Sequence, residues 1–479
     1  MNKMMNFTML MDFYELTMAN GYLEHGYRDK IACFDMFFRK VPDDGGFAIM
    51  VGLEQLIDYI KKLQFSDDDI AYLRSRGIFS EEFLSYLKNF EFSCDVWAIK
   101  EGTPIFPGEP IVKVIGPVMQ AQLLETMLLL TINHQSLIAT KSNRIVRAAK
   151  GRPIMEFGSR RAQGVYGAIH GARAAYISGC VGTACTISDI TDGIPALGTM
   201  AHSWIQLFPS EYEAFKAYAE TYPENCTLLI DTYNVLKSGL PNAIRVFKEV
   251  IIPSGHKPGG IRIDSGDITY LTKKVRQILD EQGLPEVKIC VSNSLDEYII
   301  HDLISQGACI DSFGVGERLI TSKSEPVFGG VYKLASIYDG DTEIPKIKLS
   351  ENVSKITTPC NKKVVRLYSK DSGKAIADVL MTVDEPTPCG EDYEIFDPIH
   401  TWKRKVITDY EAKELLVKVF DHGKCVYESP DVQEIRKFCM DQIDTLWDEV
   451  KRFENPHNYY VDLSEKLWKI KDKLLNEHR

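Results

Sequence analysis

The sequence has no long apolar run. Its most apolar stretch, residues 127–132, is far shorter than the ~20 residues that a membrane helix needs, and Glu125 lies just before it. The first apolar residues are followed by Asp12 and Glu15, which is unlike a secretory signal peptide. We therefore expect a cytoplasmic protein with no membrane partner.

An excess of positive charge is also lacking. The 479 residues include 56 Lys and Arg against 67 Asp and Glu, a formal net charge of −11. Phosphate backbones need clustered positive charge, so we expect no nucleic-acid partner. An anionic substrate would have to be held by a local pocket of Arg, Lys and backbone N–H groups.

Paired cysteines are missing. The 11 cysteines are scattered, none forms a C-x-x-C pair, and the count is odd, which is typical of reduced thiols that pack in a core. A zinc site built from Cys360, Cys389, Cys425 and Cys439 is an alternative to which the spacing gives little support.

Several catalytic signatures are absent. The sequence contains no G-x-x-x-x-G-K-[ST] loop, no H-E-x-x-H and no G-x-S-x-G, which argues against a P-loop nucleotide hydrolase, a zinc protease and a nucleophile-elbow hydrolase. The acidic pair after a hydrophobic strand that marks purine-salvage phosphoribosyltransferases is missing too.

The pattern of elements changes along the chain. Residues 91–117 alternate around tight turns and predict a small antiparallel unit, and residues 118–150 predict helix. From residue 152 strands and helices alternate, which predicts parallel pairing through right-handed crossovers. The expected strands are 153–157, 227–231, 260–264, 287–291 and 310–313, and the expected helices are 163–179, 243–252, 268–281 and 295–305. This succession favours an α/β barrel, with a doubly wound open sheet as the alternative.

Chemistry-bearing residues gather where these strands end. The segments are 156–161, 231–234, 262–267, 292–294 and 313–316, and together they offer carboxylates, arginines, hydroxyls and flexible glycines. This mixture suits a phosphorylated sugar held with Mg²⁺, because carboxylates bind the cation and glycine-rich turns present N–H groups to phosphate. Gly314 and Gly316 follow the last clear strand, where barrels often place a phosphate site.

Single residues in these segments also have simpler explanations. Asp231 could cap the turn after its strand, and for Asp267 capping of the helix that begins at 268 is as compatible with the sequence as catalysis. For Asp264 the balance favours a site, since Arg262 two positions earlier faces the same side of the strand. His202 lies among small residues that leave room around its ring, although a core histidine at a helix start would look the same.

The segment GTMAHS at 198–203, which contains His202, resembles the signature of the nicotinate phosphoribosyltransferase family. Further segments resemble the family in the same order along nearly the whole chain: DFYELTM at 12–18, EFGSRR at 156–161, IDSGD at 263–267, VYKL at 331–334 and NPH at 455–457.

The resemblance implies that phosphoribosyl pyrophosphate and nicotinate give nicotinate mononucleotide and pyrophosphate, with ATP as cosubstrate and Mg²⁺ as cofactor, in NAD salvage. It also implies an irregular α/β barrel beside a mixed α+β domain built from both chain ends. We expect domain boundaries at 1–120, 121–340 and 341–479, and a homodimer with shared active sites.

The resemblance further implies roles for particular residues. Tyr14 would reach in from the neighbouring subunit and stack on the pyridine ring opposite Phe157, and Thr199 would contact nicotinate. His202 would be phosphorylated, and Asp264 would lie by the ribose or its metal. The other candidate substrate-binding residues are Arg160, Arg262, Asp267, Ser292, Asn293, Gly314, Gly316 and Thr321.

Two positions depart from the family pattern. Glu317 stands where Thr often follows the second glycine, and Cys360 stands where a Pro-Gly pair has glycine. Two alternatives remain at this point: the amide-using relative, nicotinamide phosphoribosyltransferase, and a non-catalytic pyridine-nucleotide sensor. An aldolase-like barrel would want a lysine at a strand end, and the strand-end segments contain none. Ala184 favours nicotinate, because the amide-using relative has an aspartate in this segment.

Overall fold

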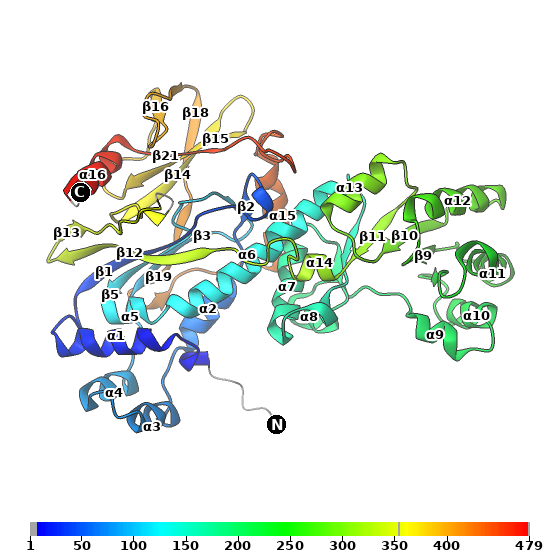
Figure 1. Cartoon of the computed structure of the whole chain (residues 1–479), viewed down its shortest axis with the longest axis horizontal. Helices are drawn as coiled ribbons and strands as arrows, with labels where there is room; N and C mark the ends of the chain where they lie inside the picture. Colours follow the sequence, from blue (N-terminus) through cyan, green and yellow to red (C-terminus); the bar gives the residue numbers. More distant parts are fainter. Residues whose placement is uncertain (1–6, 353–354, 478–479) are drawn as a thin grey trace. The chain divides into compact units, whose positions relative to one another are not determined.

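The computed structural model describes residues 7–352 and 355–477, and the chain divides into two compact units. The first combines Met1–Leu137 with Val327–Arg479, and the second is Ile138–Pro326 (Figure 1). The divisions fall after residues 137 and 326, whereas the sequence suggested boundaries at 120 and 340. The first division lies inside helix α6 (Glu125–Ala148).

The first unit is built on a seven-stranded sheet to which both ends of the chain contribute. The order of its strands is β13 (Thr342–Pro345), β12 (Gly330–Asp339), β1 (Ile31–Phe38), β5 (Val112–Pro117), β3 (Asp95–Ile99), β19 (Leu416–Asp421) and β20 (Lys424–Cys425). The antiparallel pairing expected within 91–117 is confirmed for β3 with β5. Strand β1 pairs with β5 on one side and with β12 on the other, so an early strand and a late strand share one core.

Smaller elements complete the first unit. A four-stranded sheet has the order β18 (Tyr410–Glu414), β14 (Lys362–Ser369), β15 (Ala375–Thr382) and β21 (Tyr460–Leu463). Two-stranded pairs join β2 (Ala48–Ile49) with β4 (Pro104–Ile105), and β16 (Tyr393–Phe396) with β17 (Arg404–Ile407). The helices are α1 (Phe13–Glu24), α2 (Leu53–Lys62), α3 (Asp67–Ser75), α4 (Glu81–Lys88), α5 (Val118–Gln122), α15 (Val432–Asp444) and α16 (Glu465–Glu477).

The second unit is a six-stranded parallel sheet with helical crossovers. Its order is β7 (Gly182–Thr183), β6 (Ile154–Glu156), β11 (Ser312–Val315), β10 (Lys288–Ser292), β9 (Gly260–Ile263) and β8 (Thr227–Leu229). The predicted parallel pairing is confirmed at every step of this order. Closure is not: among the described residues no hydrogen-bonded pair joins β7 to β8, so the structure shows an open sheet where a closed barrel was expected.

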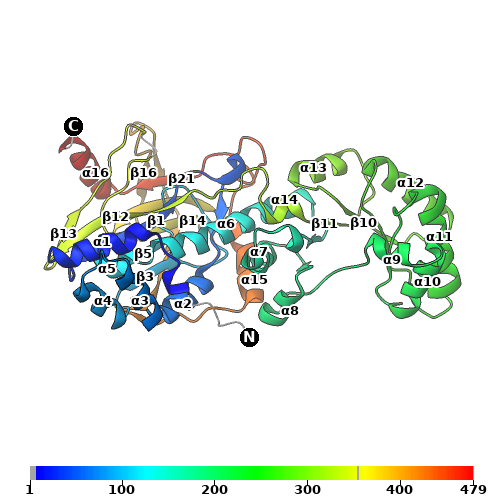
Figure 2. The same cartoon turned by 60° about the horizontal axis from the view of Figure 1, so that its bottom comes forward.

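Helices connect these strands. They are α7 (Val165–Ile177), α8 (Thr186–Asp192), α9 (His202–Leu207), α10 (Glu211–Thr221), α11 (Leu240–Val246), α12 (Ile268–Glu281), α13 (Glu297–Ser305) and α14 (Glu317–Ile320). Figure 2 shows α10 packed beside α9 and α11 in the second unit. The strands are buried because helices cover them: Ile263, Val291 and Phe313 are all fully inaccessible to solvent.

The departure at Cys360 has a local explanation. Cys360 is buried and has a φ of 74°, which lies in the left-handed region that favours glycine. Its N–H donates to the Ala335 carbonyl at 3.0 Å. The chain therefore keeps a glycine-like turn at this position although it carries a side chain there.

Candidate functional site

The carboxyl ends of the six parallel strands meet at one edge of the second unit's sheet. The segments expected there from the sequence are indeed brought together, because every pair of neighbouring strands runs in the same direction. The short strand β7 adds residues 183–185, which lie beside the end of β6. This edge carries most of the candidate residues.

Arg262 lies at the centre of a polar cluster at this edge and forms hydrogen bonds with several of its members. Its Nε donates to Ser292 Oγ at 2.9 Å, and its Nη2 donates to Asp264 Oδ1 at 3.1 Å. Its Nη1 donates to Thr199 Oγ1 at 3.2 Å and to the Met200 carbonyl at 3.3 Å. One guanidinium therefore links β9, β10 and the segment that leads into α9, which is the fork-like use to which arginine is suited.

His202 and Asp264 lie side by side in the same cluster. The Nε2 atom of His202 is 4.0 Å from Asp264 Oδ2, and Ser292 donates its hydroxyl to the other carboxylate oxygen of Asp264. His202 begins α9, and its side chain is 42% exposed against 31% for Asp264. A base and a carboxylate are thus adjacent and open to a ligand.

Two further residues of this cluster lie in the segment 231–234 but were not among the candidate site residues. Thr232 Oγ1 is 3.0 Å from His202 Nδ1. Asp231 accepts hydrogen bonds at Oδ2 from the Asp264 N–H at 2.9 Å and from the Ser265 hydroxyl at 2.6 Å. Their position in the loop that follows β8 was the available signal in the sequence. The contact of Thr232 with His202, 30 residues apart, could not be read from it because it depends on strand order.

Phe157 lies next to the two glycines that were assigned to phosphate. A Cβ on Gly314 would lie 2.5 Å from Phe157 Cδ2, and a Cβ on Gly316 would lie 3.0 Å from the Phe157 carbonyl oxygen. Phe157 also donates its N–H to the Val315 carbonyl at 2.7 Å. The structure therefore explains both glycines by the room that Phe157 needs, and a phosphate contact is not required to account for them.

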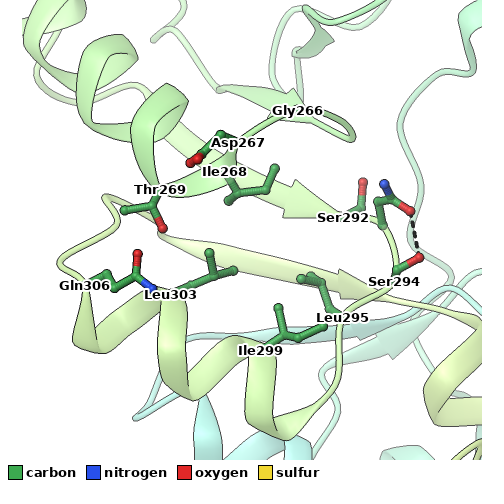
Figure 3. A pocket seen from close by; sticks show the side chains of 11 residues that line it. Gly266, Asp267, Ile268, Thr269, Ser292, Ser294, Leu295, Ile299, Leu303 and Gln306 are labelled. Carbon is green, nitrogen blue, oxygen red and sulfur yellow. Dashed lines mark hydrogen bonds between the residues drawn. The ribbon is translucent and has the colours of Figure 1, made fainter.

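Three candidates line a cavity of about 340 Å³ at the ends of β9 and β10. They are Asp267, Ser292 and Asn293, and residues of α12 and α13 complete the lining (Figure 3). Asp267 caps α12, since its carboxylate accepts the Tyr270 N–H at 2.9 Å. Asn293 has a φ of 88° and turns the chain sharply after β10. The structure thus shows the capping role, one of the two that the sequence left open for Asp267.

The remaining candidates of the second unit lie at its surface or in short helices. Arg160 is exposed in the 3-10 helix Ser159–Arg161. Thr321 follows α14, and its hydroxyl donates to the Glu317 carbonyl at 2.8 Å. The Glu317 carboxylate pairs with Lys323 Nζ at 2.7 Å, which lowers the pKa of Glu317. No bond of Arg160 or Thr321 to the Arg262 cluster is seen in the part of the chain that is described.

Tyr14 belongs to the first unit. It lies near the start of α1, behind the Asp12 capping box, and it is 43% exposed. Partial burial and a hydrogen bond to the Glu125 carboxylate raise the pKa of Tyr14 above its ordinary value, so the phenol stays protonated at neutral pH. The ring is therefore a neutral, accessible surface.

Metal-ligating clusters are few among residues 7–352 and 355–477. The only group of three or more suitable side chains in these ranges is Asp95, Asp421 and His422, and Lys418 forms ion pairs with both of its carboxylates. Cys360, Cys389, Cys425 and Cys439 do not come together, so the alternative of a zinc site is wrong for the described structure. Within the same ranges, no helix has the length and apolarity to cross a membrane.

Comparison with known proteins identifies the family of this chain. Models of the N-terminal and C-terminal domains of nicotinate phosphoribosyltransferase match residues 9–133 and 361–471. The chain belongs to the nicotinate phosphoribosyltransferase family, whose members are enzymes. The nicotinate phosphoribosyltransferase of Bacillus subtilis is 40% identical over 468 residues, which cover 97% of this chain and 94% of the relative. The mouse enzyme of the same name is 30% identical over 97% of this chain and 96% of its own.

Two solved structures are similar in fold to this chain. The crystal structure of human nicotinic acid phosphoribosyltransferase superposes with a TM-score of 0.84 at 27% identity, covering 97% of this chain and 100% of the human chain. A nicotinate-nucleotide pyrophosphorylase from Pyrococcus furiosus shares the fold, with a TM-score of 0.70 at 23% identity.

Proposed function

We propose that the protein transfers the phosphoribosyl group of phosphoribosyl pyrophosphate to the ring nitrogen of nicotinate, with release of pyrophosphate, in NAD salvage. The observation that carries the proposal is the cluster of His202, Arg262 and Asp264 at the carboxyl edge of the parallel sheet. The reaction needs a carboxylate near a cationic sugar and cations near a departing pyrophosphate, and this edge supplies both kinds of group.

The chemistry follows from the charges that develop. As the bond between C1 and the pyrophosphate oxygen breaks, positive charge grows on the ribose and negative charge on the leaving group. The Asp264 carboxylate stabilises the positive charge on the ribose, and the Arg262 guanidinium stabilises the negative charge on the pyrophosphate, because both are preorganised charges in a partly buried site. The nitrogen of nicotinate attacks C1 with its own lone pair, so no general base is required.

A magnesium ion fits the residues at the end of β8. Asp231 Oδ1 is buried and has no hydrogen-bond partner among the described residues, and the Asp231 carboxylate is held beside Asp264 by the Asp264 N–H. A buried carboxylate oxygen without a donor favours a cation. Asp231 and Asp264 would hold Mg²⁺, which when bound would neutralise charge on the pyrophosphate.

ATP assistance would act through His202. A ring nitrogen of His202 would attack the γ-phosphorus of ATP, ADP would leave, and water would later cleave the P–N bond to give phosphate. The exposure of the ring and its contacts support this role, because the Thr232 hydroxyl at Nδ1 orients the imidazole and turns Nε2 toward Asp264.

The pyridine ring would lie against Phe157, with Tyr14 of a second copy on its other face. The accessible, neutral phenol of Tyr14 supports such a role. This arrangement would require a homodimer with shared sites.

Product analysis tests the proposal. The purified protein would be incubated with phosphoribosyl pyrophosphate, Mg²⁺ and either nicotinate or nicotinamide, with and without ATP, and the nucleotides separated by chromatography. Nicotinate mononucleotide should form, and ATP should increase its yield. Nicotinamide mononucleotide as the main product would identify the amide-using enzyme, and binding without any turnover would identify a sensor.

A further inference from the structure

Glu156 ends β6 at the carboxyl edge of the sheet and is completely buried. It pairs with Val315 of β11 on one side and with Thr183 of β7 on the other. A carboxylate buried to this extent is costly unless donors satisfy it, and burial raises the pKa of Glu156. An apolar residue would fill the same space without this desolvation cost, so the hydrogen bonds of the Glu156 carboxylate indicate a role for it.

The two oxygens of Glu156 bind two different segments. Oε1 accepts the N–H of Gly158, and Oε2 accepts the hydroxyl of Thr183 at 2.6 Å. The Thr183 Oγ1 atom in turn accepts the N–H of Cys185 at 3.0 Å. A continuous series of hydrogen bonds thus runs from the segment after β6 to the segment after β7.

This series encloses two residues. Phe157 lies between Glu156 and Gly158, and Ala184 lies between Thr183 and Cys185, so the neighbours on both sides of each are held. The main chain adds to this, because the Ala184 N–H donates to the Glu156 carbonyl at 2.8 Å. The separation of the two segments is therefore fixed by the Glu156 side chain together with this main-chain bond.

We propose that Glu156 is a positioning residue that holds Phe157 and Ala184 at a fixed separation as two walls of the pyridine pocket, with Thr183 as its partner. The inference rests on the proposed function, since it takes Phe157 as the stacking surface and Ala184 as the wall that faces the ring carboxylate. Neither Glu156 nor Thr183 touches the reacting atoms; they act through the two walls.

The test compares Thr183→Val, Thr183→Ser and Glu156→Gln with the unmodified protein. Valine keeps the shape of threonine and removes the hydroxyl, whereas serine keeps the hydroxyl. Steady-state kinetics would give kcat and a separate KM for nicotinate, phosphoribosyl pyrophosphate and ATP, and thermal unfolding would give Tm. In Thr183→Val the KM for nicotinate should rise about tenfold, the effect of losing one hydrogen bond to a charged group.

The other two KM values should stay within about twofold, and Thr183→Ser should restore the nicotinate KM. Glu156→Gln should raise the nicotinate KM as well, because an amide offers one acceptor oxygen where two are used. The matched control is Asp311→Asn at the opposite edge of the sheet, where Asp311 accepts the Ile289 N–H at 2.9 Å. It should leave every KM unchanged.

An unchanged nicotinate KM in Thr183→Val, with or without a lower Tm, would overturn the inference and leave Glu156 a purely structural residue. An equal rise in all three KM values would overturn it too, since that would indicate general distortion. If the unmodified protein does not use nicotinate at all, the proposed function fails and this inference fails with it, an outcome that the product analysis distinguishes from the others.

Discussion

At the scale of single residues, the site depends on which side chains can approach His202. Thr232 and Asp264 contact or approach its two ring nitrogens, and Arg262 holds Asp264 from the other side. These four residues come from the ends of two strands, β8 and β9, and from the start of α9. Each can be changed with a result that separates a chemical role from a structural one.

His202→Ala should abolish protein phosphorylation. Incubation of the unmodified protein with γ-labelled ATP should leave acid-labile label, because a phosphorylated imidazole hydrolyses in acid. His256→Ala is the control, since His256 lies in a loop and contacts Ser254. Label retained in His202→Ala, together with full ATP-driven turnover, would show that this histidine is not the acceptor.

Asp264→Asn should lower turnover by at least ~100-fold, the usual effect of losing one electrostatic contact in a transition state. The fold should survive, because the buried Ile261 and Ile263 of β9 are untouched. Turnover and circular dichroism would be measured together, with Asp280→Asn on the exposed face of α12 as the control. Near-normal turnover would leave Asp264 only a structural role.

Ala184→Asp should reverse the preference for the ring substituent. Ala184 is exposed directly after β7, and a carboxylate there would repel the carboxylate of nicotinate while accepting a hydrogen bond from an amide. A charged hydrogen bond contributes about 1.5–3 kcal/mol, so kcat/KM for nicotinate should fall more than tenfold relative to nicotinamide. Ala196→Asp, on the neighbouring segment, serves as the control. Equal use of both substrates by the unmodified protein would contradict the argument.

At the scale of elements, the parallel sheet decides which segments meet. The helix predicted over 268–281 is observed as α12 with the same bounds, because its apolar residues recur at helical spacing and Asp267 caps it. Strand ends differ from the prediction by up to two residues, since hydrogen-bond partners and not local pattern set where pairing stops. Closure of the sheet is a property of the whole order of strands and could not be inferred from alternation alone.

Asp267→Ala separates the two roles considered for Asp267. Loss of the cap should lower the free energy of unfolding by about 1 kcal/mol, because the Tyr270 N–H loses its acceptor. Asp267→Ser would keep a capping oxygen and should restore stability. If KM for phosphoribosyl pyrophosphate rises in both variants while stability recovers in the serine variant, Asp267 also binds substrate; if KM never changes, it is a cap alone. The measurements are urea unfolding and steady-state kinetics.

At the scale of the whole molecule, both chain ends are needed to build the first unit. The late strand β12 completes the sheet of β1, and the near-terminal strand β21 pairs with β15. Such pairing buries polar groups that would be solvated in isolated segments. Asp462 on β21 is one of these, since it is only 4% exposed.

Asp462 should make stability depend on pH. Burial, and secondly the charge of Asp397, raise the pKa of Asp462 from 3.8 to about 7. A raised pKa means that the folded state keeps the proton to a higher pH than the unfolded state does. The stabilisation that this proton gives the folded state is therefore complete below pH 3.8 and is lost as the pH rises to about 7. Asp462→Asn should therefore be more stable than the unmodified protein at pH about 8 and similar to it at pH about 4. Urea unfolding at several pH values checks this, and an unchanged pH dependence would contradict it.

The sequence by itself determined the local features and, through motifs spread along the chain, the family. The helix over 268–281, the parallel alternation and the presence of Arg262 and Asp264 on one strand face all follow from short-range patterns. Only the tertiary structure decided that Thr232 contacts His202, that Gly314 makes room for Phe157, and that Glu156 joins the ends of β6 and β7. These contacts join residues that strand order brings together across tens or hundreds of positions, and a local sequence pattern carries no information about that order.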